Sequence, residues 1–471
     1  MVFASGIFLF MFLPVTLIGY WLLRNKSVQT RNLFLLIMSI GFYLESGWKE
    51  LILLLMSVIV NYVMAFLIAK YNETKLKKVF FIITLIYNIG MLFVFKYLIF
   101  VSSQIGQLIP QVKLSMSIAL PLGISFYTFQ AMSYVIDVYR DADMVEHNIL
   151  NVALYISFFP QLVAGPIVRW DSIKDNLRNP QKGGVNYGLT RFTIGLSKKV
   201  LIANQMAVLA DKAFGLLGQN ELSVGFAWIG AVGYMLQIYF DFSGYSDMAI
   251  GLGAIFGFKF PENFNYPYIS GSITEFWRRW HISLSSWFRD YVYIPLGGNR
   301  CSKPRMFFNL FIVWMLTGIW HGANYTFWLW GFCYFVFLII EKQLKLYDRK
   351  KNIIIVILRH AYTLLVVLLL WVLFRADNIS DAVNYIGIMF TGGASGSYAL
   401  GVTKLYIKNY IGYVIIAIVG CMPWLKVLNN KISFNEKAKS VTTQVGVVIL
   451  FILACCVTID SNYNPFIYFN F

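Results

Sequence analysis

Long apolar runs separated by short polar loops dominate the chain. A helix needs roughly 17 to 25 predominantly apolar residues to cross the hydrocarbon core of a bilayer. The first apolar run has no basic residue before it and is too long for the core of a signal peptide, so we expect an anchor. Runs of this kind predict about 11 crossings, at residues 2–23, 32–48, 50–69, 79–101, 117–138, 223–241, 306–320, 323–340, 353–374, 410–425 and 441–459.

Two further apolar stretches, 151–168 and 244–260, are expected to be re-entrant or to cross only half of the bilayer. Pro121, Pro160 and Pro166 interrupt this part of the sequence. Such breaks occur at membrane depth where the backbone lines a cavity or is buried in protein, although a simple helix kink is the alternative. The predicted fold is therefore an all-α polytopic membrane protein, in which re-entrant and amphipathic helices surround a central tunnel.

We expect a single membrane domain over residues 1–471. Its predicted parts are an N-terminal helical frame, a catalytic core, a set of C-terminal helices and an aromatic tail, at residues 1–110, 117–341, 353–459 and 460–471.

Composition agrees with a membrane protein, and charge predicts its orientation. The chain is 58% hydrophobic and 13% charged, whereas a soluble domain is about 25% charged. The net charge of +17 is concentrated in alternate loops, which the positive-inside rule places in the cytoplasm. This orientation places both termini on the extracytoplasmic side. The clustering of the charge in loops does not indicate a nucleic-acid ligand. The longest basic stretch, 169–222, is expected on the cytoplasmic surface beside anionic lipid headgroups or an anionic ligand such as coenzyme A.

Two of the four histidines lie in tryptophan-rich motifs. The first motif, residues 274–291, is centred on His281 and reads Thr-Glu-Phe-Trp-Arg-Arg-Trp-His-Ile-Ser-Leu-Ser-Ser-Trp-Phe-Arg-Asp-Tyr. The second, residues 318–331, is centred on His321 and reads Gly-Ile-Trp-His-Gly-Ala-Asn-Tyr-Thr-Phe-Trp-Leu-Trp-Gly. An ionisable side chain at membrane depth is costly, so an intramembrane histidine indicates a functional site. A histidine that only packs or hydrogen-bonds is the alternative for either motif.

These motifs resemble those of the membrane-bound O-acyltransferases, in particular the bacterial branch that contains the alginate and peptidoglycan O-acetylation membrane proteins. The resemblance covers nearly the whole chain and includes Phe-Asp-Phe-Ser-Gly-Tyr-Ser-Asp-Met-Ala-Ile-Gly at residues 240–251 and Tyr-Ile-Pro-Leu-Gly-Gly-Asn-Arg at 293–300. It implies that His321 is the catalytic histidine and His281 the second motif residue.

The residues around both histidines suit acyl transfer to a hydroxyl. A neutral imidazole in a low-dielectric tunnel can accept the hydroxyl proton, a role that fits His321. Donors to the oxyanion are predicted among His281, Trp320 and Asn324. If residues 276–288 form one helix, three- and four-residue spacing places the remaining tunnel-lining candidates on the face of His281, namely Trp277 and Trp280.

Charged residues near membrane depth are expected to support this site. Asp241 and Asp247 need hydrogen bonds or ion pairs there, and the predicted partners are Arg278, Arg279 or Arg289. The five cysteines show no metal-ligand spacing, so no metal is predicted.

The resemblance implies an acetyltransferase of the bacterial cytoplasmic membrane that takes acetyl groups from cytoplasmic acetyl-coenzyme A for O-acetylation of a cell-wall or other extracytoplasmic polysaccharide. A secreted partner that resembles SGNH hydrolases is implied, with membrane lipid as the surroundings. The alternatives are D-alanyl transfer to teichoic acid from a carrier-protein thioester, and a non-catalytic transporter or flippase of lipid-linked glycan.

The last eight residues, Asn-Pro-Phe-Ile-Tyr-Phe-Asn-Phe, are unusually aromatic for a chain end. They resemble the aromatic motif of acyl-relay peptides that partner the D-alanyl branch, which implies an acyl-carrying role for Tyr468. An aromatic anchor at the membrane interface is the alternative.

Overall fold

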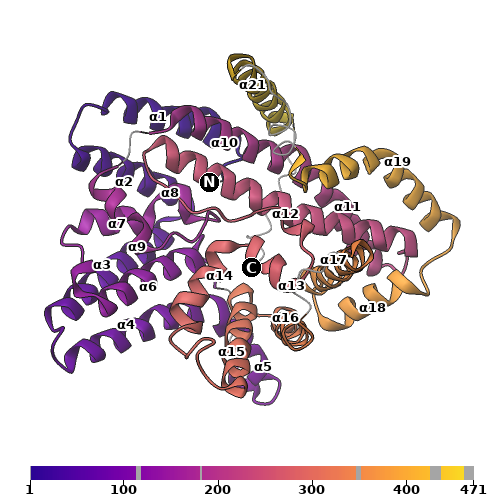
Figure 1. Cartoon of the computed structure of the whole chain (residues 1–471), viewed down its shortest axis with the longest axis horizontal. Coiled ribbons are helices and arrows are strands. Elements are labelled where there is room, and N and C mark those ends of the chain that lie inside the picture. Colours follow the sequence, from indigo (N-terminus) through magenta and orange to yellow (C-terminus); the bar gives the residue numbers. More distant parts are fainter. Residues whose placement is uncertain (1, 113–117, 181–182, 346–351, 425–435, 461–471) are drawn as a thin grey trace. The chain divides into compact units, whose positions relative to one another are not determined.

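The computed structural model describes residues 2–112, 118–180, 183–345, 352–424 and 436–460. All regular structure in these ranges is helical (Figure 1), which confirms the predicted all-α class for the described part of the chain. The chain divides into two compact units, Met1–Phe192 with Tyr245–Pro261 (unit 1) and Thr193–Gly244 with Glu262–Phe471 (unit 2).

Unit 1 contains nine complete helices among its described residues, together with the first part of α10 and the last part of α12. Their bounds are α1 (Leu13–Leu22), α2 (Val28–Leu44), α3 (Trp48–Lys70), α4 (Leu76–Leu92), α5 (Leu98–Gly106), α6 (Ile124–Arg140), α7 (Ile149–Ser157), α8 (Phe159–Leu162), α9 (Trp170–Arg178), α10 (Val185–Ser197) and α12 (Val224–Ile255). Short π-helical turns, Phe8–Phe12 and Phe93–Tyr97, precede α1 and α5.

Helices α3, α4 and α6 lie side by side in unit 1 (Figure 1). A buried amide pair joins α3 to α4, since Asn88 Nδ2 donates to Asn61 Oδ1 over 2.8 Å and Asn61 Nδ2 donates to Asn88 Oδ1 over 3.2 Å. Polar side chains in spanning helices need such partners because lipid supplies none. The pair therefore fixes the register of these two helices.

Unit 2 contains the rest of α10 and most of α12, with a π-helical segment, Lys198–Ala203, directly after α10. Its other helices are α11 (Asn204–Leu217), α13 (Ile273–Arg279), α14 (Ile282–Phe288), α15 (Lys303–His321), α16 (Tyr325–Gln343), α17 (Ile353–Arg375), α18 (Ile379–Phe390), α19 (Ser397–Gly420) and α21 (Glu436–Asp460).

Helices α15 and α16 pack closely in unit 2 because glycines face each other where they cross. A Cβ atom on Gly318 would lie 2.5 Å from the carbonyl oxygen of Phe327, and one on Gly331 would lie 2.5 Å from that of Trp314. Small residues at such a crossing let two backbones approach. This contact places the C-terminal end of α15, which carries His321, against α16.

Seven helices of the described residues are long and apolar enough to cross a membrane. Five of them coincide with predicted crossings, and a sixth, Ser397–Gly420, begins earlier than the predicted 410–425. Predicted crossings 223–241 and 306–320 lie in α12 and α15, which are not among the seven, and α6 starts at Ile124 within predicted crossing 117–138. The shorter apolar helices Phe8–Leu22 and Val28–Leu44 correspond to the first two predicted crossings.

The segment 169–222 was predicted to lie on the cytoplasmic surface, but Val185–Leu217 within it is one of the seven candidate spans. The prediction treated the basic residues of this segment as unpaired charges, but two of them form ion pairs with carboxylates. Arg191 binds Asp247 over 2.7 Å in unit 1, and Lys199 binds Asp241 over 2.7 Å in unit 2. Paired charges are tolerated at membrane depth far better than single ones.

Candidate active site

The first motif bends sharply at His281. Helix α13 ends at Arg279, α14 begins at Ile282, and His281 between them has left-handed backbone angles, φ 44° and ψ 54°. The predicted continuous helix over 276–288 was therefore wrong. Backbone bonds to the preceding loop replace helical ones, since Ile282 N donates to Asn263 O over 3.0 Å. A non-glycine residue in this conformation costs about 1–3 kcal/mol, and such strain is common at functional sites.

The hydrogen bonds of His281 define its tautomer. Its Nδ1 lies 3.1 Å from Asn263 Oδ1, and the same amide atom receives the backbone N–H of Ser283 over 3.2 Å. A backbone N–H can only donate, so this atom is the oxygen and His281 Nδ1 carries the proton. His281 Nε2 is buried and has no hydrogen-bond partner among the described residues. This nitrogen therefore presents its lone pair.

His281 lies outside the seven candidate spans, and burial lowers the pKa of its imidazole to about 3. The charged form is disfavoured because the site removes it from water. The imidazole is thus neutral at physiological pH, and its Nε2 can accept a hydrogen bond.

His321 lies at the C-terminal end of α15 and is surrounded by aromatic rings. Its ring centroid is 5.0 Å from Trp320, 5.1 Å from Trp330 and 5.0 Å from Phe374. A side chain at Gly322 would collide with Phe327, because a Cβ atom there would lie 2.4 Å from its ring. Glycine at this position therefore allows the Phe327 ring to pack against the backbone beside His321.

Trp320 connects the two histidines. Its ring centroid lies 6.0 Å from His281 and 5.0 Å from His321, so the three side chains form one group, called here the two-histidine cluster. Phe242 of α12 packs edge-on against His281 at 4.6 Å. Two motifs separated by about 40 residues are thereby brought together within unit 2.

The other predicted tryptophans are buried, but not on one face with His281. Trp277 packs against Trp314 at 4.8 Å, whereas Trp280 packs against Phe264 and Trp371 at 5.0 Å each. Because the chain bends at His281, the three- and four-residue spacing of a continuous helix does not apply to these side chains.

Asn324 has a helix-capping role. Its Oδ1 accepts the backbone N–H of Thr326 at the start of α16 over 3.0 Å, and its Nδ2 donates to Asp377 O over 2.8 Å. Capping of this kind satisfies an orphan backbone donor. The contact with Asp377 uses one of the two amide N–H groups, so the oxyanion-donor role of Asn324 stays a prediction.

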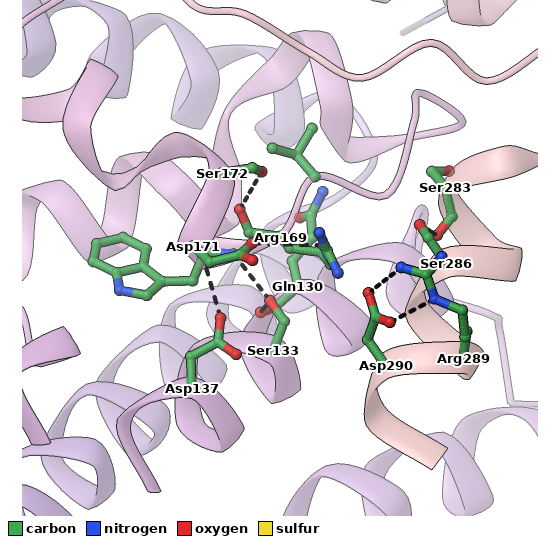
Figure 2. A network of polar contacts seen from close by, with 12 residues as sticks. Gln130, Ser133, Asp137, Arg169, Asp171, Ser172, Ser283, Ser286, Arg289 and Asp290 are labelled. Atoms are coloured by element: carbon green, nitrogen blue, oxygen red, sulfur yellow. Dashed lines mark hydrogen bonds and ion pairs between the residues drawn. The ribbon is translucent and has the colours of Figure 1, made fainter. Parts of the chain in front are cut away.

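The predicted partners of the two acids differ from those in the structure. Asp241 binds Lys199 and Asp247 binds Arg191, whereas the arginines of the first motif have other neighbours. Arg279 binds Glu275 over 2.9 Å, one helical turn away. Arg289 binds the adjacent Asp290 over 2.7 Å, as Figure 2 shows, and Arg278 is exposed. These ion pairs differ from those that proximity in the sequence suggested.

Two residues that the sequence analysis missed hold the start of the first motif. Glu341 of α16 is fully buried and accepts hydrogen bonds from the backbone N–H groups of Ile273 and Thr274 and from Thr274 Oγ1, at 2.5, 2.8 and 2.7 Å. The ring of His360 of α17 lies between two carbonyl oxygens, with Nε2 2.8 Å from Ile269 O and Nδ1 2.8 Å from Val356 O. A lone carboxylate at the end of an apolar run was the available signal for Glu341.

Trp330 is a further residue that was missed. It is fully buried beside His321, and its indole Nε1 has no hydrogen-bond acceptor among the described residues. A buried indole N–H normally finds a partner. Its position beside His321 makes Trp330 a further candidate site residue.

A separate polar network lies in unit 1, where the prolines were predicted to interrupt the helices (Figure 2). Asp137 of α6 accepts the backbone N–H of Asp171 over 3.3 Å and so caps α9, while Arg169 and Asp171 form an ion pair at 3.5 Å. Ser133 donates to the carbonyl of Gln130 over 2.8 Å. These contacts give the broken segment a defined structure.

Among the described residues, no group of three or more histidine, cysteine, aspartate or glutamate side chains has the arrangement of a metal site. Tyr468 lies outside the described residues.

The helices, the candidate spans and the buried two-histidine cluster define a multi-pass helical membrane protein with a group suited to acid–base chemistry. The sequence model of the membrane-bound O-acyltransferase family matches residues 9–380. The chain belongs to this family, and it is an O-acyltransferase.

Named relatives agree with this result. The chain is 44% identical to the probable alginate O-acetylase of Pseudomonas aeruginosa over 402 residues, which are 83% of this chain and 75% of the relative. It is 36% identical to the peptidoglycan O-acetyltransferase of Helicobacter pylori over 84% of this chain and 81% of the relative. The match to the teichoic acid D-alanyltransferase of Bacillus subtilis is 32% identical over 49% of this chain and 60% of that protein.

Proposed function

We propose that this protein transfers acetyl groups from cytoplasmic acetyl-coenzyme A to a hydroxyl acceptor that leads to an extracytoplasmic polysaccharide. The observation that carries the proposal is the two-histidine cluster, in which two buried imidazoles flank Trp320. The acetyl group is favoured over D-alanine because the O-acetylating relatives match most of the chain, whereas the D-alanyltransferase matches about half.

In the proposed reaction, His321 accepts the proton of the acceptor hydroxyl while the hydroxyl oxygen attacks the thioester carbonyl carbon. The carbon–sulfur bond then breaks, and the imidazolium of His321 returns the proton to the leaving thiolate. The products are an oxygen ester and a free thiol. General-base assistance of this kind contributes about 10²- to 10⁴-fold to the rate.

His281 has a different proposed role from the one that the sequence suggested. Its Nδ1 proton is directed to Asn263, so the neutral imidazole offers only an acceptor at Nε2 and does not serve as an oxyanion donor. We assign it to orienting the acceptor hydroxyl. Trp330 Nε1–H, beside His321, is the proposed oxyanion donor, because developing negative charge is stabilised best by preorganised donors.

Orientation follows from charge. We propose that the basic loops face the cytoplasm, that the acyl group moves outward, and that both termini lie outside. A secreted partner that resembles SGNH hydrolases would accept the acyl group there. An acyl-carrying role for Tyr468 is a separate proposal, which replacement by phenylalanine would test because only the nucleophilic hydroxyl is lost.

The proposed function is tested by turnover of the purified full-length protein in proteoliposomes. Acetyl-coenzyme A should release free thiol in the presence of a polysaccharide hydroxyl acceptor, and a D-alanyl carrier-protein thioester should not. Preference for the D-alanyl thioester would show that the protein is a D-alanyltransferase instead. Translocation of lipid-linked glycan with no thiol release from either donor would identify a transporter and contradict the proposal.

A further inference from the structure

A groove of about 720 Å³ lies in unit 1, between the end of α1, the start of α2, the start of α10 and the last turn of α12. Its walls are bonded to one another. Tyr20 Oη donates to Phe256 O over 2.8 Å, and the backbone N–H of Gly184 donates to Ala254 O over 3.0 Å. A Cβ atom on Gly183 would lie 2.3 Å from Ile255 O, so glycine is required where the loop meets α12. The groove is thus part of the fixed structure.

The rim of the groove is cationic. Arg24 and Arg31 both line it, and neither forms an ion pair with a carboxylate among the described residues. Arg31 lies 6.0 Å from the Tyr20 ring, and its Nε is buried with no hydrogen-bond partner in the described structure. Arg24 lies 4.5 Å from the Trp21 ring. Two guanidinium groups without carboxylates suit a phosphate, which they bind through paired N–H donors.

The rest of the groove is apolar. Ile18, Val185 and Leu189 line it, and they are 59%, 50% and 42% exposed. Ile18 belongs to an apolar helix and Leu189 to a candidate membrane span, so these faces adjoin the hydrocarbon. Trp21, which is 58% exposed, marks the level of the headgroups. A free phosphate or nucleotide would make no contact with this apolar wall. An amphiphile can contact the cationic rim with its headgroup and the apolar wall with its acyl chain.

We propose that this groove binds one anionic phospholipid of the leaflet next to the Arg24 loop, with its phosphate between Arg24 and Arg31 and an acyl chain along Ile18 and Leu189. Basic pockets between membrane helices recognise anionic headgroups in this way. The lipid would join α1 and α2 to α10 and α12. This site is independent of the proposed acyl transfer and does not require it.

The test compares lipid binding by the full-length protein and by single variants. Purified protein in phosphatidylcholine nanodiscs is titrated with phosphatidylglycerol, and bound lipid is counted by native mass spectrometry. Arg24→Gln and Arg31→Gln should each weaken phosphatidylglycerol binding by about tenfold, the effect of losing one charge-assisted contact. Lys26→Gln removes the same charge from the same loop but does not line the groove, so it should bind like the wild type.

Arg24 is exposed, so its replacement should leave the fold intact even if Arg31→Gln impairs it. Equal weakening by Lys26→Gln would show nonspecific attraction and overturn the proposal. Phosphatidylcholine that competes as well as phosphatidylglycerol would overturn it too. Displacement of the lipid by millimolar inorganic phosphate or coenzyme A would show a site for soluble anions instead.

Discussion

His281 combines a left-handed backbone with a side-chain hydrogen bond at the bend of the first motif. Its left-handed backbone is held by pairing with the loop at Asn263, and its Nδ1 by the Asn263 side chain. The sequence indicated the histidine but not this bend, because the surrounding spacing favours a continuous helix. The competing loop lies about 18 residues earlier in the chain, and no local pattern connects it to the motif.

The neutral state of His281 predicts acid sensitivity. Burial lowers its folded-state pKa to about 3 from the ordinary 6.5, so the unfolded chain binds more protons between these values. Stability contributed by this group is present above pH 6.5 and is lost as pH falls, with a slope of about 1.4 kcal/mol per pH unit. Thermal unfolding in detergent from pH 7 to pH 4 should show this slope in the wild type. His281→Gln should flatten it, and an unchanged acid profile would contradict the assigned cause.

The buried Lys199–Asp241 pair predicts strong non-additivity. Both side chains are almost fully buried, so removal of one partner leaves a buried charge and should cost about 3–5 kcal/mol. Lys199→Met and Asp241→Leu should each lower the melting temperature markedly, and the double variant should recover most of the loss. Additive losses in the double variant would show that the two side chains act separately.

At the scale of elements, helix existence could be predicted from sequence better than helix ends. Hydrophobic length located Trp48–Lys70, Tyr325–Gln343 and Ile353–Arg375 close to their observed bounds. It missed Val185–Leu217, because a charge count does not reveal that Arg191 and Lys199 have carboxylate partners more than 40 residues away. Ion pairing is a tertiary property, and only the fold discloses it.

Helix α13 depends on a cap from another helix. Glu341 of α16 accepts both backbone N–H groups at its start, and a carboxylate there also favours the positive end of the helix dipole. Glu341→Gln should therefore lower both thermal stability and acyl turnover, the stability by roughly 1–3 kcal/mol. Gln343→Ala, two positions further on the same helix, is the matched control and should leave both unchanged because Gln343 is exposed. Wild-type behaviour of Glu341→Gln would remove this residue from the support of the site.

At the scale of the whole molecule, the orientation in the membrane determines whether the proposed acyl transfer runs outward or inward. Lys350 and Asn462, which the charge pattern places inside and outside, lie outside the described residues, so described positions serve for the test. Single cysteines at Glu45, Glu73 and Lys345, in a chain with its own cysteines replaced, are treated with a membrane-impermeant maleimide in intact cells. Position 45 should react, and positions 73 and 345 should react only after permeabilisation. The reverse pattern would reverse the proposed acyl flow.

The central claim is that His321 is the base in acyl transfer, and one measurement tests it most directly. Acetyl transfer from acetyl-coenzyme A to a hydroxyl acceptor is compared for purified wild-type protein, His321→Ala and His147→Ala. His147 is exposed in unit 1 and serves as the matched control. His321→Ala should lose about 10²- to 10⁴-fold in kcat while it stays folded and inserted, and His147→Ala should match the wild type. Near wild-type turnover by folded His321→Ala would contradict the account.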